Sequence, residues 1–351
     1  MSSITSLRLN WLTRIRHLHW VATAALACGI LPLFRVAKLP LSFTWRSFFL
    51  MFWGGFALQS LFMAVVLYAI AKPRELLTYL ANRGPKAPFP IRKFLAMLLP
   101  AAYFFVMFFI TICYNDIIAA MRFNGSSDAL LAEVDKALLF GHSVSSIAHF
   151  GATHLNVWTL KFLELVYFGM FPQIGACIIL LAMKCGLRES FKFVASITTA
   201  YYISLVFFFF FPATGPYYGC QDHLKAWTAG LQITDSQGSF VHLLDFYRAQ
   251  GRPSFIATDY FIAIPSMHIV QPLLVLWFLR AWKRAFFFLA AYDVFLVVSI
   301  IALEQHYVVD VLMGVPVAIA AAAMVDWSSI SATMVPTEKL CHKSQDGLVV
   351  R

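Results

Sequence analysis

The feature that most constrains this chain is a series of long apolar stretches separated by shorter polar segments. A helix needs about 20 mostly apolar residues to cross the hydrocarbon core of a bilayer. Eight stretches approach or exceed that length, near residues 17–34, 47–71, 94–118, 157–182, 190–211, 265–282, 285–303 and 306–327. The chain is therefore predicted to be an all-α, polytopic membrane helix bundle with about eight transmembrane helices.

Composition supports the same class. Of the 351 residues, 60% are hydrophobic and 13% are charged, whereas a soluble domain is nearer half apolar and a quarter charged. The net charge of +10 raises the question of nucleic-acid binding. The Lys and Arg residues, however, gather in short runs between apolar stretches, which is the pattern of a membrane protein. We expect lipids of the bilayer as partners and no nucleic acid; the sequence leaves the oligomeric state open.

The distribution of Lys and Arg also predicts the orientation. With the N-terminus inside, the predicted cytoplasmic segments hold 18 of the 27 Lys and Arg residues. This bias places both ends in the cytoplasm and the starts of the stretches at 265–282 and 306–327 on the extracytoplasmic side, periplasmic or lumenal. The compact chain favours a bacterial inner membrane. Two outer segments are long, 119–156 and 212–264, and loops of this length are often functional or disordered. Residues 239–250, SFVHLLDFYRAQ, are amphipathic and predict an ordered lid or an interfacial helix.

The segment Ile264-Pro265-Ser266-Met267-His268 opens the sixth stretch. Proline is favoured in the first turn of a helix, where its missing N–H costs nothing. The free N–H groups there, together with the helix dipole, form a site for an anion such as phosphate. Ser266 adds a hydroxyl and His268 a titratable donor. The alternative is an ordinary helix start with a capping hydroxyl.

A second polar group opens the eighth stretch. His306 and Asp310 are four residues apart, so they share one face of a helix. An Asp that accepts a hydrogen bond from one imidazole nitrogen leaves the other nitrogen available as a base or nucleophile. The alternatives are a structural His–Asp pair and, because these residue types bind metals, a metal site. Ionisable groups are costly at membrane depth, which favours a functional role. Both helix starts face the same side, so we expect one shared site.

Two motifs carry a resemblance to a known family: Pro265-Ser266-x-His268 and Ser299-x6-His306-x3-Asp310. They resemble the second and third motifs of the type 2 phosphatidic acid phosphatase (PAP2) superfamily, which includes lipid phosphate phosphatases, vanadium haloperoxidases and sphingolipid phosphotransferases. The resemblance covers residues 94–327, a six-helix core. Two additional helices with a basic cytoplasmic loop at 1–93, and a polar cytoplasmic tail at 328–351, are expected outside this core.

The chain departs from the family pattern at two places. Ile300 stands where the third motif usually has Arg, and the first motif, Lys-x6-Arg-Pro, is missing after the fifth stretch. Arg252-Pro253 is present, but Asp245 stands where the Lys is expected. This divergent form is similar to the inositol-phosphorylceramide synthase branch and its bacterial relatives, in which a Pro-rich segment follows the third core helix and the third motif contains His-Tyr-x-x-Asp.

The resemblance implies a mechanism. His306 would attack phosphorus and become a phosphohistidine, Asp310 would orient His306, and His268 would act as acid and then base. Neither a metal nor a cofactor is required. Positive partners for the transferring group are expected from the start of the sixth helix and from cations. The expected contacts to the phosphate or the substrate are Ser266, Lys225, Arg248, Arg252, Tyr217 and Asp116.

The sequence therefore predicts a membrane enzyme that transfers a phosphoryl headgroup from a lipid donor to an alcohol, similar to inositol-phosphorylceramide synthase. One alternative is a lipid-phosphate or polyprenyl-phosphate phosphatase, which differs in using water as the acceptor. An alternative of another class is a transporter or a catalytically inactive member. A transporter is expected to place ionisable groups near the bilayer midplane, and of the groups considered only Asp293 has that position.

Overall fold

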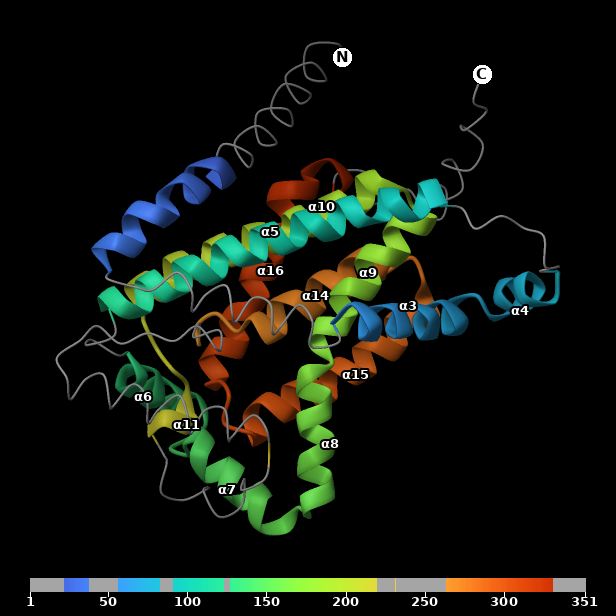
Figure 1. The fold of residues 1–351 in the computed structure, drawn as a ribbon. Coiled ribbons are helices and arrows are strands. Elements are labelled where there is room, and N and C mark those ends of the chain that lie inside the picture. The colour runs from blue at the N-terminus through green and yellow to red at the C-terminus, as the bar shows by residue number, and fades with distance from the viewer. Residues whose placement is uncertain are drawn as a thin grey trace, which may run out of the picture.

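The computed structural model describes residues 22–37, 56–82, 91–122, 127–219, 231 and 263–330. These residues form helices joined by turns (Figure 1), and there is no strand among them. The all-α prediction is confirmed for this part of the chain. The amphipathic stretch at 239–250, predicted as a lid or interfacial helix, lies outside the described residues.

The first helix among the described residues, Ala22–Val36, carries no label in Figure 1. The labelled helices follow in chain order: α3 (Ala57–Ala71), α4 (Pro73–Asn82), α5 (Ile91–Arg122), α6 (Asp128–Leu138), α7 (Val144–His154), α8 (Val157–Phe168), α9 (Met170–Lys184), α10 (Leu187–Phe210), α11 (Pro216–Gly219), α14 (Met267–Leu279), α15 (Lys283–Ala302) and α16 (Val308–Ile330).

Within the described residues, five helical segments are long and apolar enough to cross a membrane: Leu98–Ile118 in α5, Val157–Lys184 across α8 and α9, Leu187–Phe210, Lys283–Ala302 and Val308–Val325. Three shorter apolar helices, Ala22–Val36, α3 and α14, occupy the other three predicted stretches. Each of the eight stretches thus contains an apolar helix, and the chain is a multi-pass integral membrane protein.

The segment at 119–156, expected as a long outer loop, instead holds two short helices, α6 and α7. Helix α6 is amphipathic: Leu131 and Asp135 are buried, while Glu133 and Lys136 are exposed. A loop was expected because no stretch here is long enough to cross a membrane. A helix that packs only one face on its neighbours needs no such stretch.

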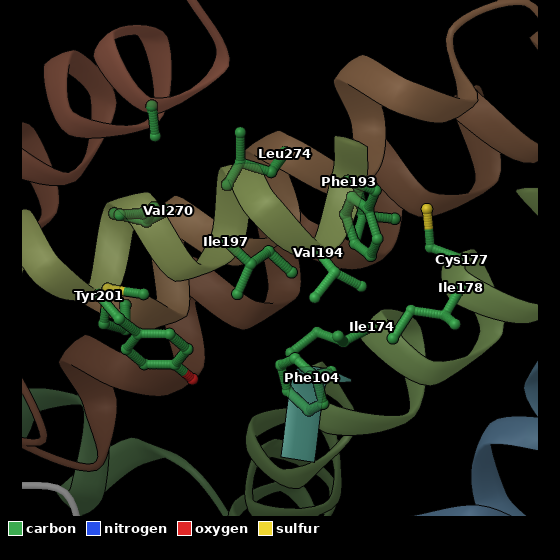
Figure 2. Packing of buried hydrophobic residues seen from close by; sticks show 14 of the residues in the cluster. Phe104, Ile174, Cys177, Ile178, Phe193, Val194, Ile197, Tyr201, Val270 and Leu274 are labelled. Carbon is green, nitrogen blue, oxygen red and sulfur yellow. The ribbon is translucent and has the colours of Figure 1, made fainter. Parts of the chain in front are cut away.

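The core of the bundle is formed by α5, α9, α10 and α14. Figure 2 shows their side chains packed together, among them Phe104, Ile174, Phe193 and Leu274. These residues are at most 2% exposed. Burial of a large apolar side chain stabilises by roughly 1.5–3 kcal/mol in water. Inside lipid, close packing between helices rather than exclusion of water contributes most.

The helices Ala22–Val36 and α3 also pack on the bundle. Helix α3 lies along α9. The helix Ala22–Val36 contacts α5, where the Tyr114 hydroxyl donates to the Leu26 carbonyl at 2.9 Å, and it contacts α10 through the hydroxyls of Thr23 and Tyr202, 3.1 Å apart. Both N-terminal helices therefore extend the same bundle.

Helices α14 and α16 approach each other closely at Gly314. A Cβ at this position would lie 2.9 Å from the Ile269 Cβ and 3.1 Å from the Ser266 carbonyl oxygen. The missing side chain thus lets the start of α14 pack on the first turns of α16. Helices α6, α7 and α11 gather at the end of the bundle where α15 ends and α16 begins (Figure 1).

Candidate active site

Two imidazoles meet at the end of the bundle where α14 and α16 begin. His268 is the second residue of α14, and His306 lies two residues before α16. His268 Nδ1 is 3.2 Å from His306 Nε2, and the ring centroids are 5.3 Å apart. The residues are 38 positions apart in sequence, so the fold and not a local turn brings them together.

The other nitrogen of His306 defines its tautomer. His306 Nδ1 is 3.0 Å from the Ala263 carbonyl oxygen, which can only accept a hydrogen bond. Nδ1 therefore carries a proton. In the neutral ring the lone pair then lies on Nε2, which faces His268. His306 is almost fully buried, at 6% exposure, so this pairing is shielded from water.

Asp310 supports the same ring. Its Oδ2 lies 3.5 Å from His306 Nδ1 and accepts the Tyr307 backbone N–H at 2.9 Å. Its carbonyl oxygen accepts the Ser266 N–H at 3.0 Å, which joins the start of α14 to α16. Asp310 is fully buried, and its Oδ1 has no hydrogen-bond partner. Asp310 Oδ2 is thus hydrogen-bonded to the turn and lies within ion-pair distance of the His306 ring.

The start of α14 lacks a side-chain cap. Ser266 is the N-cap residue in an extended conformation, but its hydroxyl makes no capping bond. That hydroxyl is buried without a hydrogen-bond partner. The expectation that Pro265 stands in the first helical turn is wrong, because the helix begins at Met267 and the extended Ser266 separates Pro265 from it. A buried polar donor at an uncapped helix N-terminus suits an anionic group.

Tyr167 holds the plane of the second imidazole. Its ring stacks on His268 with centroids 4.2 Å apart and an interplanar angle of 26°. Tyr167 lies near the end of α8, inside an apolar stretch, where an aromatic residue is unremarkable in sequence. The stack was therefore not foreseen. His268 Nε2, on the far side of the ring, is buried without a hydrogen-bond partner.

The Pro-rich segment after α10, residues 211–218, packs against the turn that carries His306. The Tyr217 N–H donates to the Glu304 carbonyl at 3.1 Å. Gly215 has a φ of +97°, and a Cβ there would lie 2.7 Å from the Gln305 carbonyl oxygen. Only glycine suits both the backbone conformation and the close approach. Tyr217, predicted as a substrate contact, is thus buried beside the segment 304–306.

Glu304 is a further buried carboxyl in this turn. It is fully buried, with a φ of +53°. Burial raises its pKa to about 7, while the Ser145 hydroxyl at the start of α7 lowers it. The local sequence does not mark Glu304 as buried, because its burial depends on contacts such as that with Ser145 of α7.

The other predicted site residues have different positions. Asp116 is buried on α5, a helix that packs mainly on α10 and α9. It takes part in none of the contacts given above for His268, His306 and Asp310. Lys225, Arg248 and Arg252 lie outside the described residues. Within the described part of the chain, no three His, Cys, Asp or Glu side chains form a group that could hold a metal ion.

Comparisons with known proteins bear on the family. Neither the curated proteins nor the solved structures contain a match to the chain. A family model described as the PAP2 superfamily matches residues 129–324, more than half of the chain, and this region contains His268, His306 and Asp310. The chain therefore belongs to the PAP2 superfamily, a family of the lipid phosphatase and phosphotransferase type.

Proposed function

We propose that this protein transfers a phosphoryl headgroup from a lipid donor through a phosphohistidine at His306. The observation that carries the proposal is the imidazole pair. His306 Nδ1 is held by the Ala263 carbonyl, and Nε2 faces His268 at 3.2 Å. A nucleophile that lies beside an acid–base residue, and whose other nitrogen is fixed by an acceptor, is an arrangement typical of covalent catalysis.

In the first step, His306 Nε2 attacks the phosphorus of the donor. An N–P bond forms, the bond from phosphorus to the leaving oxygen breaks, and protonated His268 gives its proton to that oxygen. Asp310 and the Ala263 carbonyl stabilise the positive charge that develops on the ring of His306. Donor binding has to displace the contact between the two imidazoles, because His268 occupies the space in front of Nε2.

In the second step, His268 takes the proton from the hydroxyl of the acceptor. The acceptor oxygen attacks phosphorus, the N–P bond breaks, and neutral His306 is regenerated. Each step transfers one proton at His268, so the enzyme returns to its starting state. We assign the orientation of the His268 ring to its stack on Tyr167.

The charge on the transferring group needs donors close by. The uncapped N-terminus of α14 and the buried hydroxyl of Ser266 supply donors within the described residues. We assign further positive charge to the three cations that follow the fifth apolar stretch. They are Lys225, Arg248 and Arg252. Tyr217 and Asp116 are proposed as contacts to the headgroup or the acceptor.

We propose an alcohol rather than water as the acceptor. The chain lacks the Lys-x6-Arg-Pro motif, and a phosphodiester donor carries less charge to neutralise than a phosphomonoester. We therefore propose a phosphotransferase similar to inositol-phosphorylceramide synthase. We also propose that the site lies on the extracytoplasmic face, with both termini in the cytoplasm and the six-helix catalytic core at 94–327. We propose a bacterial inner membrane as the location.

The test is a turnover assay on purified protein in lipid. A radiolabelled inositol phospholipid is supplied with ceramide as the acceptor or with water alone, and labelled phosphatidic acid is tested in parallel. Headgroup transfer that depends on ceramide supports the transferase. Release from phosphatidic acid alone would make the protein a phosphatase.

Two variants test whether the reaction measured in this assay takes place at the imidazole pair. His306→Ala and His268→Ala are expected to lose at least about a thousandfold in turnover, as expected when a nucleophile or its acid–base partner is removed. His142→Ala, which changes an exposed histidine in the turn between α6 and α7, is the matched control. Full activity in His306→Ala would refute the nucleophile assignment.

A further inference from the structure

At the start of α16, the side chains of the helix itself do not supply acceptors for all of the first backbone N–H groups. The first N–H groups of any helix have no partner within the helix. In α16 the residue before the first turn is Tyr307, whose side chain is too long to cap its own helix. Asp310 accepts the Tyr307 N–H, and this hydrogen bond is one half of a capping box. The N–H groups of Val308 and Val309 still need an acceptor.

Asp135 of α6 supplies that acceptor from another part of the chain. Its Oδ2 accepts the Val308 N–H at 2.8 Å, and its Oδ1 accepts the Val309 N–H at 2.9 Å. Asp135 is 1% exposed. The carboxylate lies at the positive end of the α16 dipole, where a negative charge is stabilising. One buried side chain therefore caps the helix that carries Asp310, from 173 residues away.

The same helix contacts the site a second time. Two turns before Asp135, Asp128 accepts the Tyr307 hydroxyl at 3.2 Å. It also accepts the backbone N–H groups of Thr214 and Gly215. Helix α6 thus joins the Pro-rich segment to the turn that carries His306, and the carboxylates of Asp128 and Asp135 fix both sides of that turn.

We propose that Asp135 is a positioning residue, which caps α16 so that Asp310 and His306 lie at the distances phosphoryl transfer needs. This inference rests on the proposed function. Asp135 acts through the first turn of α16 and does not touch the substrate. Since misplacement by about 1 Å can reduce turnover about a hundredfold, a cap that fixes this turn controls the rate.

The decisive variants are Asp135→Ala, which removes both acceptors, and Asp135→Asn, which keeps one. Glu133→Gln is the matched control, since it removes one negative charge from the exposed face of the same helix. We expect kcat per folded molecule to fall by about 10–100-fold in Asp135→Ala and less in Asp135→Asn. KM should change by less than about threefold, because the headgroup contacts remain. Turnover within twofold of Glu133→Gln in folded Asp135→Ala would overturn the proposal.

A second measurement needs no turnover and so separates this inference from the proposed reaction. Hydrogen–deuterium exchange of peptides covering 303–312 should be faster in Asp135→Ala and Asp135→Asn than in the parent, while peptides from α9 and α10 should be unchanged. Equal protection of 303–312 in all forms would show that Asp135 does not hold the start of α16. A general loss of protection would contradict a local positioning role and indicate a stabilising role for the whole fold.

Discussion

At the scale of single residues, the site is determined by which atoms are paired and which are not. His306 Nδ1 has an acceptor in Ala263, while the Ser266 hydroxyl, His268 Nε2 and Asp310 Oδ1 are buried without hydrogen-bond partners. Unpaired buried polar atoms are costly. A phosphate group could pair with a hydroxyl and an imidazole at once, so these atoms are consistent with a site for an oxygen-rich ligand.

Glu304 gives a pH-dependent prediction at this scale. Burial raises its pKa from the ordinary 4.5 to about 7, so the folded state favours the protonated form. The corresponding stability is complete below about pH 4.5 and is lost as the pH rises through 7. Glu304→Gln removes the ionisation and should be the more stable form at pH 8, by up to about 3 kcal/mol. The melting temperature in detergent between pH 5 and pH 8 measures this difference.

The control is Glu133→Gln, which removes an exposed carboxyl. The melting temperature of the parent should fall toward pH 8 more steeply than that of Glu304→Gln, and Glu133→Gln should follow the parent. If Glu304→Gln and the parent gave parallel curves, Glu304 would not be the buried acid described here.

Sequence reasoning selected the polar residues of the site but not the partners that orient them. The spacing of His306 and Asp310 predicts a shared helix face, and the structure adds the Ala263 carbonyl and the ring of Tyr167. A backbone carbonyl has no sequence signal. A tyrosine in an apolar stretch is equally compatible with a lipid-facing position, so the stack on His268 could not be anticipated.

At the scale of elements, the contact between α14 and α16 keeps the two halves of the site together. Gly314→Ala should separate them, because the new Cβ would press on the Ile269 Cβ and the Ser266 carbonyl, neither of which is a flexible side-chain end. Overpacking of this kind costs about 1–3 kcal/mol. Since Ser266 is the N-cap of α14, the displacement reaches His268, and we expect turnover to fall at least about tenfold.

The matched control is Gly151→Ala in α7, where the nearest neighbour of the new Cβ is Leu155 Cδ1 at 3.9 Å. Turnover and the amount of folded protein are compared in the two variants. Gly314→Ala with the turnover of Gly151→Ala would show that the close approach of α14 and α16 is not needed for the reaction.

The sequence predicts the apolar helices, whereas it does not predict the short helices α6 and α7. Each of the eight stretches contains an apolar helix, because apolar length alone determines that outcome. Helices α6 and α7 depend on tertiary contacts such as those of Asp128 and Asp135. Such contacts join residues far apart in the chain, which a local pattern cannot reveal.

At the scale of the whole molecule, a contact between two helices of the bundle accounts for one ionisable group outside the site described above. Asp293 lies within α15, and its Oδ1 accepts a hydrogen bond from the Gln173 side chain of α9 at 3.0 Å. An interhelical hydrogen bond of this kind is an ordinary feature of helix packing in membranes. The ionisable groups at the site instead cluster at helix starts, which favours an enzyme over a transporter.

The orientation of the bundle is tested by labelling single cysteines. In a variant without the native cysteines, His142→Cys lies in the exposed turn between α6 and α7, and Arg188→Cys lies at the start of α10, at the opposite end of the bundle. We expect a membrane-impermeant maleimide to label His142→Cys in intact cells and Arg188→Cys only after permeabilisation, because Lys and Arg gather on the cytoplasmic side. The reverse pattern would place the site in the cytoplasm.

The central claim is that His306 becomes covalently phosphorylated. His268→Ala removes the acid of the first step and the base of the second. The variant is therefore incubated with a phosphorus-labelled nitrophenyl ester of the headgroup phosphate, whose nitrophenolate leaving group needs no proton, so that only the second step is blocked and the intermediate accumulates. The reaction is then quenched and the protein is digested. We predict acid-labile, base-stable label on the peptide that contains His306, with none in the double variant His268→Ala/His306→Ala. Transfer of the headgroup by the parent protein with no label on His306 in His268→Ala, or with label on another residue, would contradict the account.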